Sequence, residues 1–62
     1  MSIESLMGRI VSVVSEAALD AEKFDRGNDA AGRRIRKACM EVSRACKNVR
    51  TEVQSIRNHR KE

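Results

Sequence analysis

A short polar stretch near the middle of the chain, Arg26-Gly27-Asn28-Asp29, constrains the fold more than any other part of the sequence. Glycine adopts the left-handed backbone conformation that closes a helix C-terminus without a steric penalty. Asn28 is of a residue type preferred at helix N-caps, and the acidic Asp29 complements the positive end of the helix dipole. The stretch therefore predicts a turn at about residues 25–28 between two helices.

The segment before the turn, residues 2–25, has the periodicity of an amphipathic helix. Its main apolar stripe has the three- and four-residue spacing of one helix face. This stripe consists of Ile3, Leu6, Ile10, Val13, Ala17, Ala21 and Phe24. Four further residues, Met7, Val11, Val14 and Ala18, widen it to nearly half of the circumference. One partner helix cannot cover so wide a stripe, so we expect a second contact surface.

The segment after the turn, residues 29–59, predicts a second and longer helix. Its apolar residues alternate spacings of four and three, which is typical of helices packed in coiled coils and bundles. A short connection makes the two helices antiparallel, and the longer helix leaves Ile56 without a partner in the same chain. We therefore expect an all-α protein with one domain, residues 1–62, folded as an antiparallel two-helix hairpin that dimerises into a four-helix bundle. The predicted oligomer core is Ile10, Val14, Ile35, Cys39, Val42, Cys46, Val49, Val53 and Ile56.

The net charge of the chain is +4, and it is unevenly distributed. Residues 25–62 hold 11 cations and five anions, whereas residues 1–24 hold two cations and four anions. Such asymmetry indicates a surface for an acidic polymer, although a solvated charged face would give the same composition. With one aromatic residue in 62, the chain has little material for a core of its own.

Five cations of the second helix project away from the apolar positions and form a stripe about 20 Å long. This cationic stripe consists of Arg33, Arg36, Lys37, Arg44 and Lys47. Rows of this kind match the phosphates of a nucleic-acid backbone. The shortage of aromatic residues disfavours base stacking, and the absence of Asn or Gln within the row disfavours reading of base edges. The sequence predicts binding of duplex DNA without sequence preference, with RNA left open. The predicted binding residues are Arg33, Arg34, Arg36, Lys37, Arg44, Lys47 and Arg50.

No constellation of residues indicates catalysis or metal binding. The one histidine, His59, has no nucleophile or carboxylate at a spacing that forms a dyad. Cys39 and Cys46 lie about 10 Å apart along a helix, too far for a disulfide within the chain, and no zinc-ligand pattern is present. Both cysteines are interpreted as packing residues. We expect no enzyme activity, cofactor, metal or small-molecule substrate.

The stretch from Asp25 to Arg36 resembles the chlamydial and related bacterial linker-histone-like proteins. The matching residues are Gly27, Asn28, Ala30, Ala31, Arg34, Ile35 and Arg36, and the later Val49-Arg50-x-Glu52 and the basic end also look similar. The resemblance implies a cytoplasmic, nucleoid-associated protein that compacts DNA without sequence preference. The chain departs from the family at the acidic Asp29, and it carries no long Lys/Ala-rich tail. We therefore expect the folded bundle itself to bind DNA.

Two other interpretations compete with DNA binding. The first is a helical module that associates with itself or with a partner helix, in which the charges only maintain solubility. The second is a peripheral membrane role, which is disfavoured because the basic face lies opposite the apolar one. The longest apolar run, residues 10–14, is far shorter than the roughly 20 residues of a membrane span.

Overall fold

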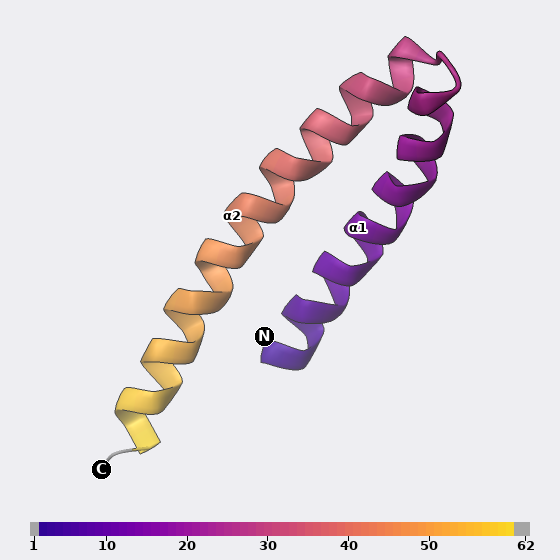
Figure 1. The fold of residues 1–62 in the computed structure, drawn as a ribbon. Helices are drawn as coiled ribbons and strands as arrows, with labels where there is room; N and C mark the ends of the chain where they lie inside the picture. Colours follow the sequence, from indigo (N-terminus) through magenta and orange to yellow (C-terminus); the bar gives the residue numbers. More distant parts are fainter. Residues whose placement is uncertain (1, 61–62) are drawn as a thin grey trace.

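Two antiparallel helices make up the fold in a computed structural model, which describes residues 2–60. Helix α1 spans Ile3–Asp25 and helix α2 spans Asp29–Arg60, and residues 2–60 contain no strand. Figure 1 shows the two helices side by side, with α2 continuing beyond the N-terminal end of α1. The prediction of an all-α helical hairpin is confirmed. Residues 1, 61 and 62 of the expected domain lie outside the described part of the chain.

The turn closes α1 through the backbone geometry expected of its glycine. Gly27 has a φ of 105°, in the left-handed region. Its N–H donates to the Phe24 carbonyl at 2.9 Å, and the Asn28 N–H donates to the Lys23 carbonyl at 3.1 Å. This pair of hydrogen bonds is the Schellman arrangement, which satisfies the carbonyl groups left unpaired at a helix end. A side chain at position 27 would strain the turn.

Both helices begin with a capping side chain. The Ser2 hydroxyl accepts a hydrogen bond from the Ser5 N–H at 3.0 Å, and the Asn28 side-chain oxygen accepts one from the Ala31 N–H at 3.2 Å. Each contact satisfies an amide that has no carbonyl partner within its helix. The predicted N-cap role of Asn28 is confirmed. Each helix therefore begins directly after a residue whose side chain caps it.

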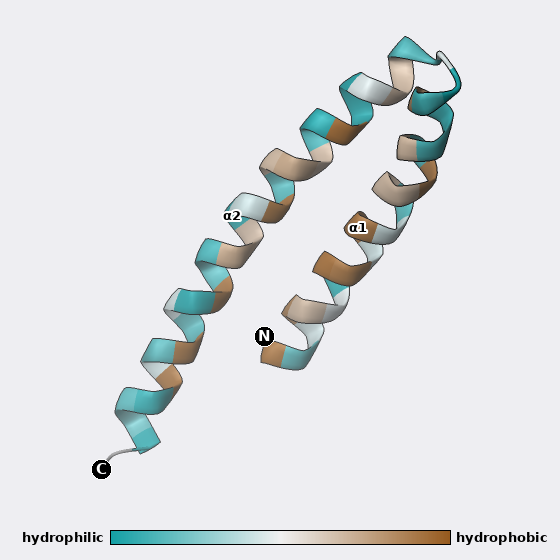
Figure 2. Cartoon of the chain, in the orientation of Figure 1, coloured by the Kyte–Doolittle hydropathy of each residue, from teal (hydrophilic) through white to brown (hydrophobic). Residues whose placement is uncertain are grey.

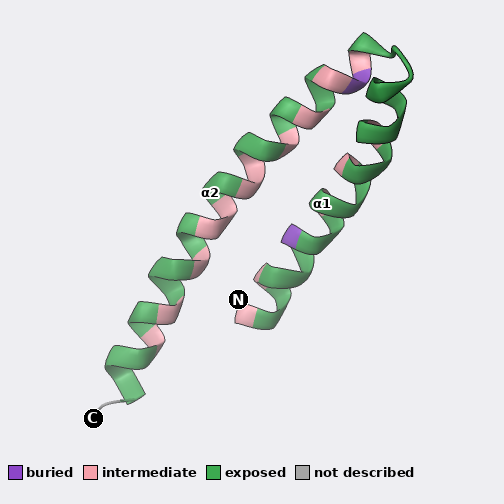
Figure 3. Ribbon diagram, viewed as in Figure 1, coloured by how far each residue is buried: buried purple, intermediate pink, exposed green. Residues whose placement is uncertain are grey.

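The contact between the helices is narrow. Figure 2 shows hydrophobic residues along the facing sides of both helices, and Figure 3 shows how few residues are buried there. Within residues 2–60 only Ile10 and Ala31 are buried, with exposed fractions of 8% and 0%. Ile10 lies beside Val42 and Ala45 of α2, so it belongs to the core of the single hairpin. Small residues near the turn bring the helices close together at that end.

The two flanks of the hairpin differ in chemistry. Because successive residues are about 100° apart around a helix, Arg9 and Val11 lie on opposite flanks of the inward-facing Ile10. The same relation places Lys37 and Cys39 on opposite flanks of Ala38. Arg9 and Lys37 line one common groove. Since the helices are antiparallel, Val11 and Cys39, which follow the inward-facing Ile10 and Ala38, lie together on the other flank of the hairpin.

We call that second flank the apolar face, and it carries the extra stripe of α1 that one partner helix cannot cover. Met7, Val11 and Val14 are 45%, 60% and 50% exposed. From α2 the same flank receives Cys39, which is exposed, and Ile35, Val42 and Cys46, which are half-buried. The apolar face consists of Met7, Val11, Val14, Ala18, Ile35, Cys39, Val42 and Cys46.

Candidate nucleic-acid interface

All seven cations predicted to bind nucleic acid lie on α2, and all are exposed. Three salt bridges occur within residues 2–60, and of the seven predicted cations only Arg34 takes part in one. The remaining six present their charges to solvent. They are Arg33, Arg36, Lys37, Arg44, Lys47 and Arg50.

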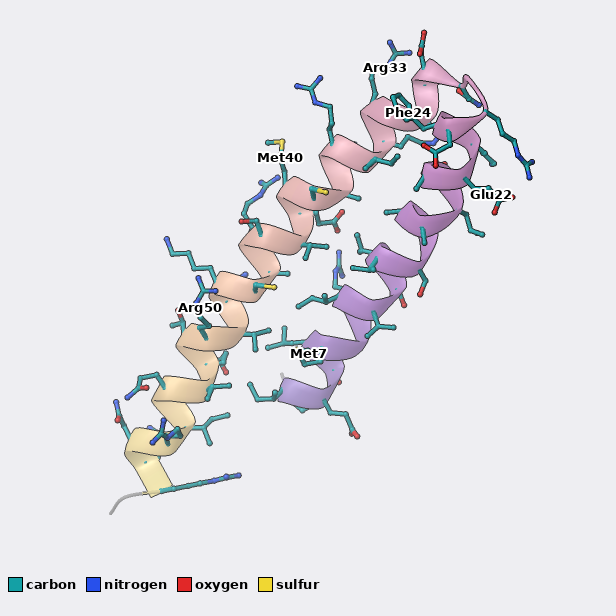
Figure 4. All side chains as sticks on the ribbon, viewed as in Figure 1. Met7, Glu22, Phe24, Arg33, Met40 and Arg50 are labelled. Atoms are coloured by element: carbon teal, nitrogen blue, oxygen red, sulfur yellow. The ribbon has the colours of Figure 1, made fainter. Side chains whose placement is uncertain are left out.

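Five of the six cations occupy two neighbouring rows of α2, whereas Arg50, three helical turns after Cys39, lies on the side of the apolar face. Arg33, Lys37 and Arg44 are separated by four and seven residues, which places them on the flank that faces away from the apolar face. Arg36 and Lys47 are separated by 11 residues, or three helical turns, and lie on the side of α2 farthest from α1. Figure 4 shows Arg33 and the exposed Met40 projecting from that outer side. The cationic stripe is therefore accessible along about 20 Å of helix.

Arg34 differs from its neighbours because it contacts α1. Its Nε and Nη2 atoms donate to the Asp20 Oδ1 atom at 3.1 and 3.0 Å. The Asp20 side chain is 17% exposed, whereas the Arg34 side chain is 50% exposed. The hydrogen bonds from Arg34, with the charges of Arg34 and Lys23, lower the pKa of the Asp20 carboxyl. Arg34 thus joins the two helices, which places it apart from the other predicted binding residues.

An open groove runs between the helices on the flank opposite the apolar face. It has a volume of about 550 Å³. Three cations from both helices line it, Arg9, Lys37 and Arg44, together with the single anion Glu41. Its remaining lining residues are Leu6, Ala45 and Asn48. We call it the cationic groove.

Arg9 and Asn48 were not among the predicted binding residues. The helix that carries Arg9 has an excess of acidic residues, and Asn48 lies outside the row of cations, so the charge pattern alone does not single them out. The pairing of the helices brings both beside the cationic stripe. The position of Arg9 directly before an inward-facing apolar residue, as Lys37 lies before Ala38, is the sequence signal for this placement.

Other reactive groups are not brought together within the described part of the chain. Residues 2–60 contain no cluster of three or more His, Cys, Asp or Glu side chains able to hold a metal ion. Both cysteines are free thiols; Cys39 is exposed in the single chain and Cys46 is half-buried. His59 is exposed near the end of α2. No helix within residues 2–60 is long and apolar enough to cross a membrane.

These features define a small basic helical hairpin whose surface suits a polyanion. The chain matches the family model described as histone H1-like protein Hc1 over residues 4–59, and it belongs to that family. The match covers the turn and almost all of both helices. The chain is therefore a histone-like, nucleoid-associated DNA-binding protein, and the predicted family is confirmed. The family is a structural one, not a family of enzymes. Comparisons with curated proteins and with solved structures find no match.

Proposed function

We propose that the protein binds the backbone of duplex DNA without sequence preference and compacts the bacterial nucleoid in the cytoplasm. The observation that carries this proposal is the row of exposed cations on α2. All six are exposed, and none of them has a salt-bridge partner within residues 2–60. Unpaired cations in a row gain most from replacing the counterions of a polyanion. The proposed contact residues are Arg33, Arg36, Lys37, Arg44, Lys47 and Arg50. Arg34 should contribute less to DNA binding because its guanidinium is paired with the Asp20 carboxylate.

The chemistry of the stripe explains why sequence preference should be slight. Long cationic side chains contact phosphates, which are the same at every base pair. Discrimination between base pairs requires side chains positioned against base edges in a groove, usually from a helix that enters it. The neighbours of the cations on the outer side of α2, Met40 and Ser43, offer no bidentate partner for a base. The proposed binding is therefore dominated by electrostatics and depends strongly on salt.

Compaction requires one particle to hold more than one DNA segment, and we propose that two hairpins pair through their apolar faces. The chain exposes 5246 Å², whereas a compact monomer of 7.0 kDa exposes about 4,000 Å². The excess of about 1,200 Å² is more than the roughly 800 Å² per partner buried in a standard protein interface. A second copy of the chain carries the same apolar face, so the two faces can cover each other.

Pairing through the apolar faces leaves the cationic surfaces on opposite outer sides of the bundle. Arg9 and Lys37 lie on the flank opposite Val11 and Cys39, as the helical steps require. A dimer of this form would present two separate cationic surfaces, one from each chain. Each dimer can therefore join two duplex segments, which is the proposed basis of compaction.

The test is the salt dependence of duplex binding in a variant that carries Arg33→Gln, Arg36→Gln and Lys37→Gln. The slope of log affinity against log salt should flatten by about 0.9 for each phosphate that the variant no longer neutralises, or about three units per stripe. A matched variant, Lys23→Gln with Arg26→Gln and Arg57→Gln, removes the same charge away from the stripe and should flatten the slope less. Circular dichroism should show unchanged helicity in both. If the stripe variant binds duplex DNA as tightly as wild type, the protein is instead a self-association module.

A further inference from the structure

The cationic groove brings together charges that are distant in the sequence. Arg9 comes from α1, and Lys37 and Arg44 come from α2 two turns apart. Three cations face one anion, Glu41, so the lining carries a net charge of +2. The apolar side chains of Leu6 and Ala45 and the amide of Asn48 also line the groove. Such a groove offers charge and hydrogen-bond donors from two sides to one elongated anion.

The anion already in the groove is held weakly. The Arg9 Nη2 atom lies 3.9 Å from the Glu41 Oε2 atom, at the outer limit of an ion pair. The two side chains are 72% and 45% exposed, so solvent screens their attraction. In contrast, the Arg26 and Glu22 side chains form a hydrogen-bonded pair at 2.8 Å at the turn end of the hairpin. Glu41 is therefore a partner that a stronger acceptor can replace.

We propose that one strand of the DNA duplex lies in the cationic groove, with Arg9 as a phosphate ligand from α1 and Glu41 as a competing anion. This inference rests on the proposed DNA binding and adds a binding residue on the other helix and a residue that restrains affinity. The phosphate replaces the Glu41 carboxylate beside Arg9, while Lys37 and Arg44 contact neighbouring phosphates of the same strand. The amide of Asn48 donates to a phosphate oxygen in the groove.

Three features favour a nucleic-acid strand as the occupant. The groove is open to solvent and is lined by residues of both helices, so a continuous chain can enter it. Lys37 and Arg44 are about 10 Å apart along the helix, a spacing that two phosphates of one strand, rather than a single phosphate group, can satisfy. The groove also lies on the flank opposite the apolar face, so it stays accessible when two copies pair. Duplex DNA is the occupant because it is the polyanion of the proposed function on which this inference rests.

The first test compares Glu41→Gln with Glu22→Gln, which removes the same charge from the tighter ion pair at the turn. Duplex affinity of Glu41→Gln should increase several-fold, and the salt slope should steepen by up to about 0.9, because Arg9 gains a phosphate in place of the carboxylate. Glu22→Gln should change both much less. Equal effects of the two variants would overturn the competition by Glu41.

The second test uses Arg9→Gln and the double variant Arg9→Gln/Glu41→Gln, with Lys23→Gln as the charge-matched control on α1. Arg9→Gln should flatten the salt slope by about 0.9, and Lys23→Gln by less. Glu41→Gln should raise the affinity for DNA less in the Arg9→Gln variant than in wild type. The reason is that Glu41 lowers affinity partly by competing with a phosphate for Arg9. Strict additivity would overturn the proposed exchange of partners.

The outcomes also separate this inference from the proposed function. If the stripe variant binds more weakly while Arg9→Gln matches its control, DNA binding stands and the groove is not its site. If neither variant changes affinity, the proposed function fails as well. The same titrations with duplex RNA test the assignment of the strand: a larger effect of Arg9→Gln on RNA than on DNA would overturn duplex DNA as the occupant.

Discussion

The ring of Phe24 lies directly against Gly32, across the turn between the two helices. A Cβ atom built at Gly32 would lie 2.7 Å from the Phe24 Cε1 atom and 2.8 Å from its Cδ1 atom. Figure 4 shows Phe24 reaching from the end of α1 toward the first turns of α2. Ala31, the neighbour of Gly32, is completely buried. The only aromatic residue of the chain therefore packs against α2 at Gly32, where the absence of a side chain leaves room for the ring.

The first prediction concerns this packing of Phe24 on Gly32. Gly8 also lies inside a helix, but a Cβ there would meet nothing within 4 Å. Gly8→Ala should therefore stabilise the protein by about 0.5–1 kcal/mol through helix propensity. Gly32→Ala gains the same propensity but displaces the Phe24 ring, and overpacking costs about 1–3 kcal/mol. Gly32→Ala should thus be less stable than Gly8→Ala by about 1 kcal/mol or more in urea unfolding followed by circular dichroism. Equal gains would show that the ring, which is 47% exposed, moves without cost.

The second prediction concerns the pH dependence of stability through Asp20. Hydrogen bonds from Arg34 lower the pKa of the Asp20 carboxyl in the folded protein. Its contribution is therefore present above the unfolded pKa of about 3.9 and is lost as the pH falls through the lower folded value. Asp20→Asn should reduce stability at neutral pH and weaken the decrease in stability between neutral and acidic pH. Denaturant unfolding at several pH values measures this, and solvent screening keeps the effect small.

Glu16→Gln is the control for this measurement. Glu16 is an exposed carboxylate of α1, close in sequence to Asp20, and it forms no salt bridge within residues 2–60. Its replacement should leave the pH profile nearly parallel to that of wild type. A profile of Asp20→Asn that also runs parallel to wild type would contradict the coupling between Asp20 and Arg34.

The hairpin could be predicted because its determinants are local. Gly27 and Asn28 define the turn by backbone conformation and capping, and the apolar spacing defines each helix. The pairing of side chains across the hairpin was not predicted in the same detail. The contact between Arg34 and Asp20 joins residues 14 apart in sequence, so it depends on the register of the two helices. Periodicity specifies which face is apolar, but a small shift in rotation decides which cation is paired.

The same limit explains the cysteines and Arg9. The heptad of α2 passes through Cys39, yet the side that faces α1 is formed by smaller residues such as Ala38 and Ala45, and Cys39 is exposed. The apolar stripe is wider than the surface that contacts α1, and the spacing alone does not say which of its residues meet α1. Arg9 shares a groove with Lys37 only because the two helices pair, and periodicity within one helix does not reveal this.

The third prediction concerns the two thiols. If Cys39 and Cys46 are packing residues, the double variant Cys39→Ala/Cys46→Ala should remain folded and oligomeric, with stability reduced by roughly 1–3 kcal/mol. Part of this reduction should appear only in the associated state, because Cys39 is exposed in the single chain. Unfolding of wild type and variant in reducing buffer with a chelator, at several protein concentrations, measures both parts. A complete absence of assembly in the variant would instead indicate a disulfide or metal requirement.

The last prediction tests pairing through the apolar face with two residues that one chain exposes equally. Val11 is 60% exposed and Met40 is 62% exposed, but Val11 lies on the apolar face and Met40 on the outer side of α2. In a monomer, an aspartate at either site would change stability by only about 0.5 kcal/mol. In a dimer, Val11→Asp places an unpaired charge in the interface, which costs several kcal/mol, while Met40→Asp remains in solvent. Sedimentation equilibrium at micromolar concentration should therefore show a dimer for wild type and Met40→Asp, and a monomeric or unfolded chain for Val11→Asp. A well-folded wild-type monomer, or equal behaviour of the two variants, would refute the proposed pairing.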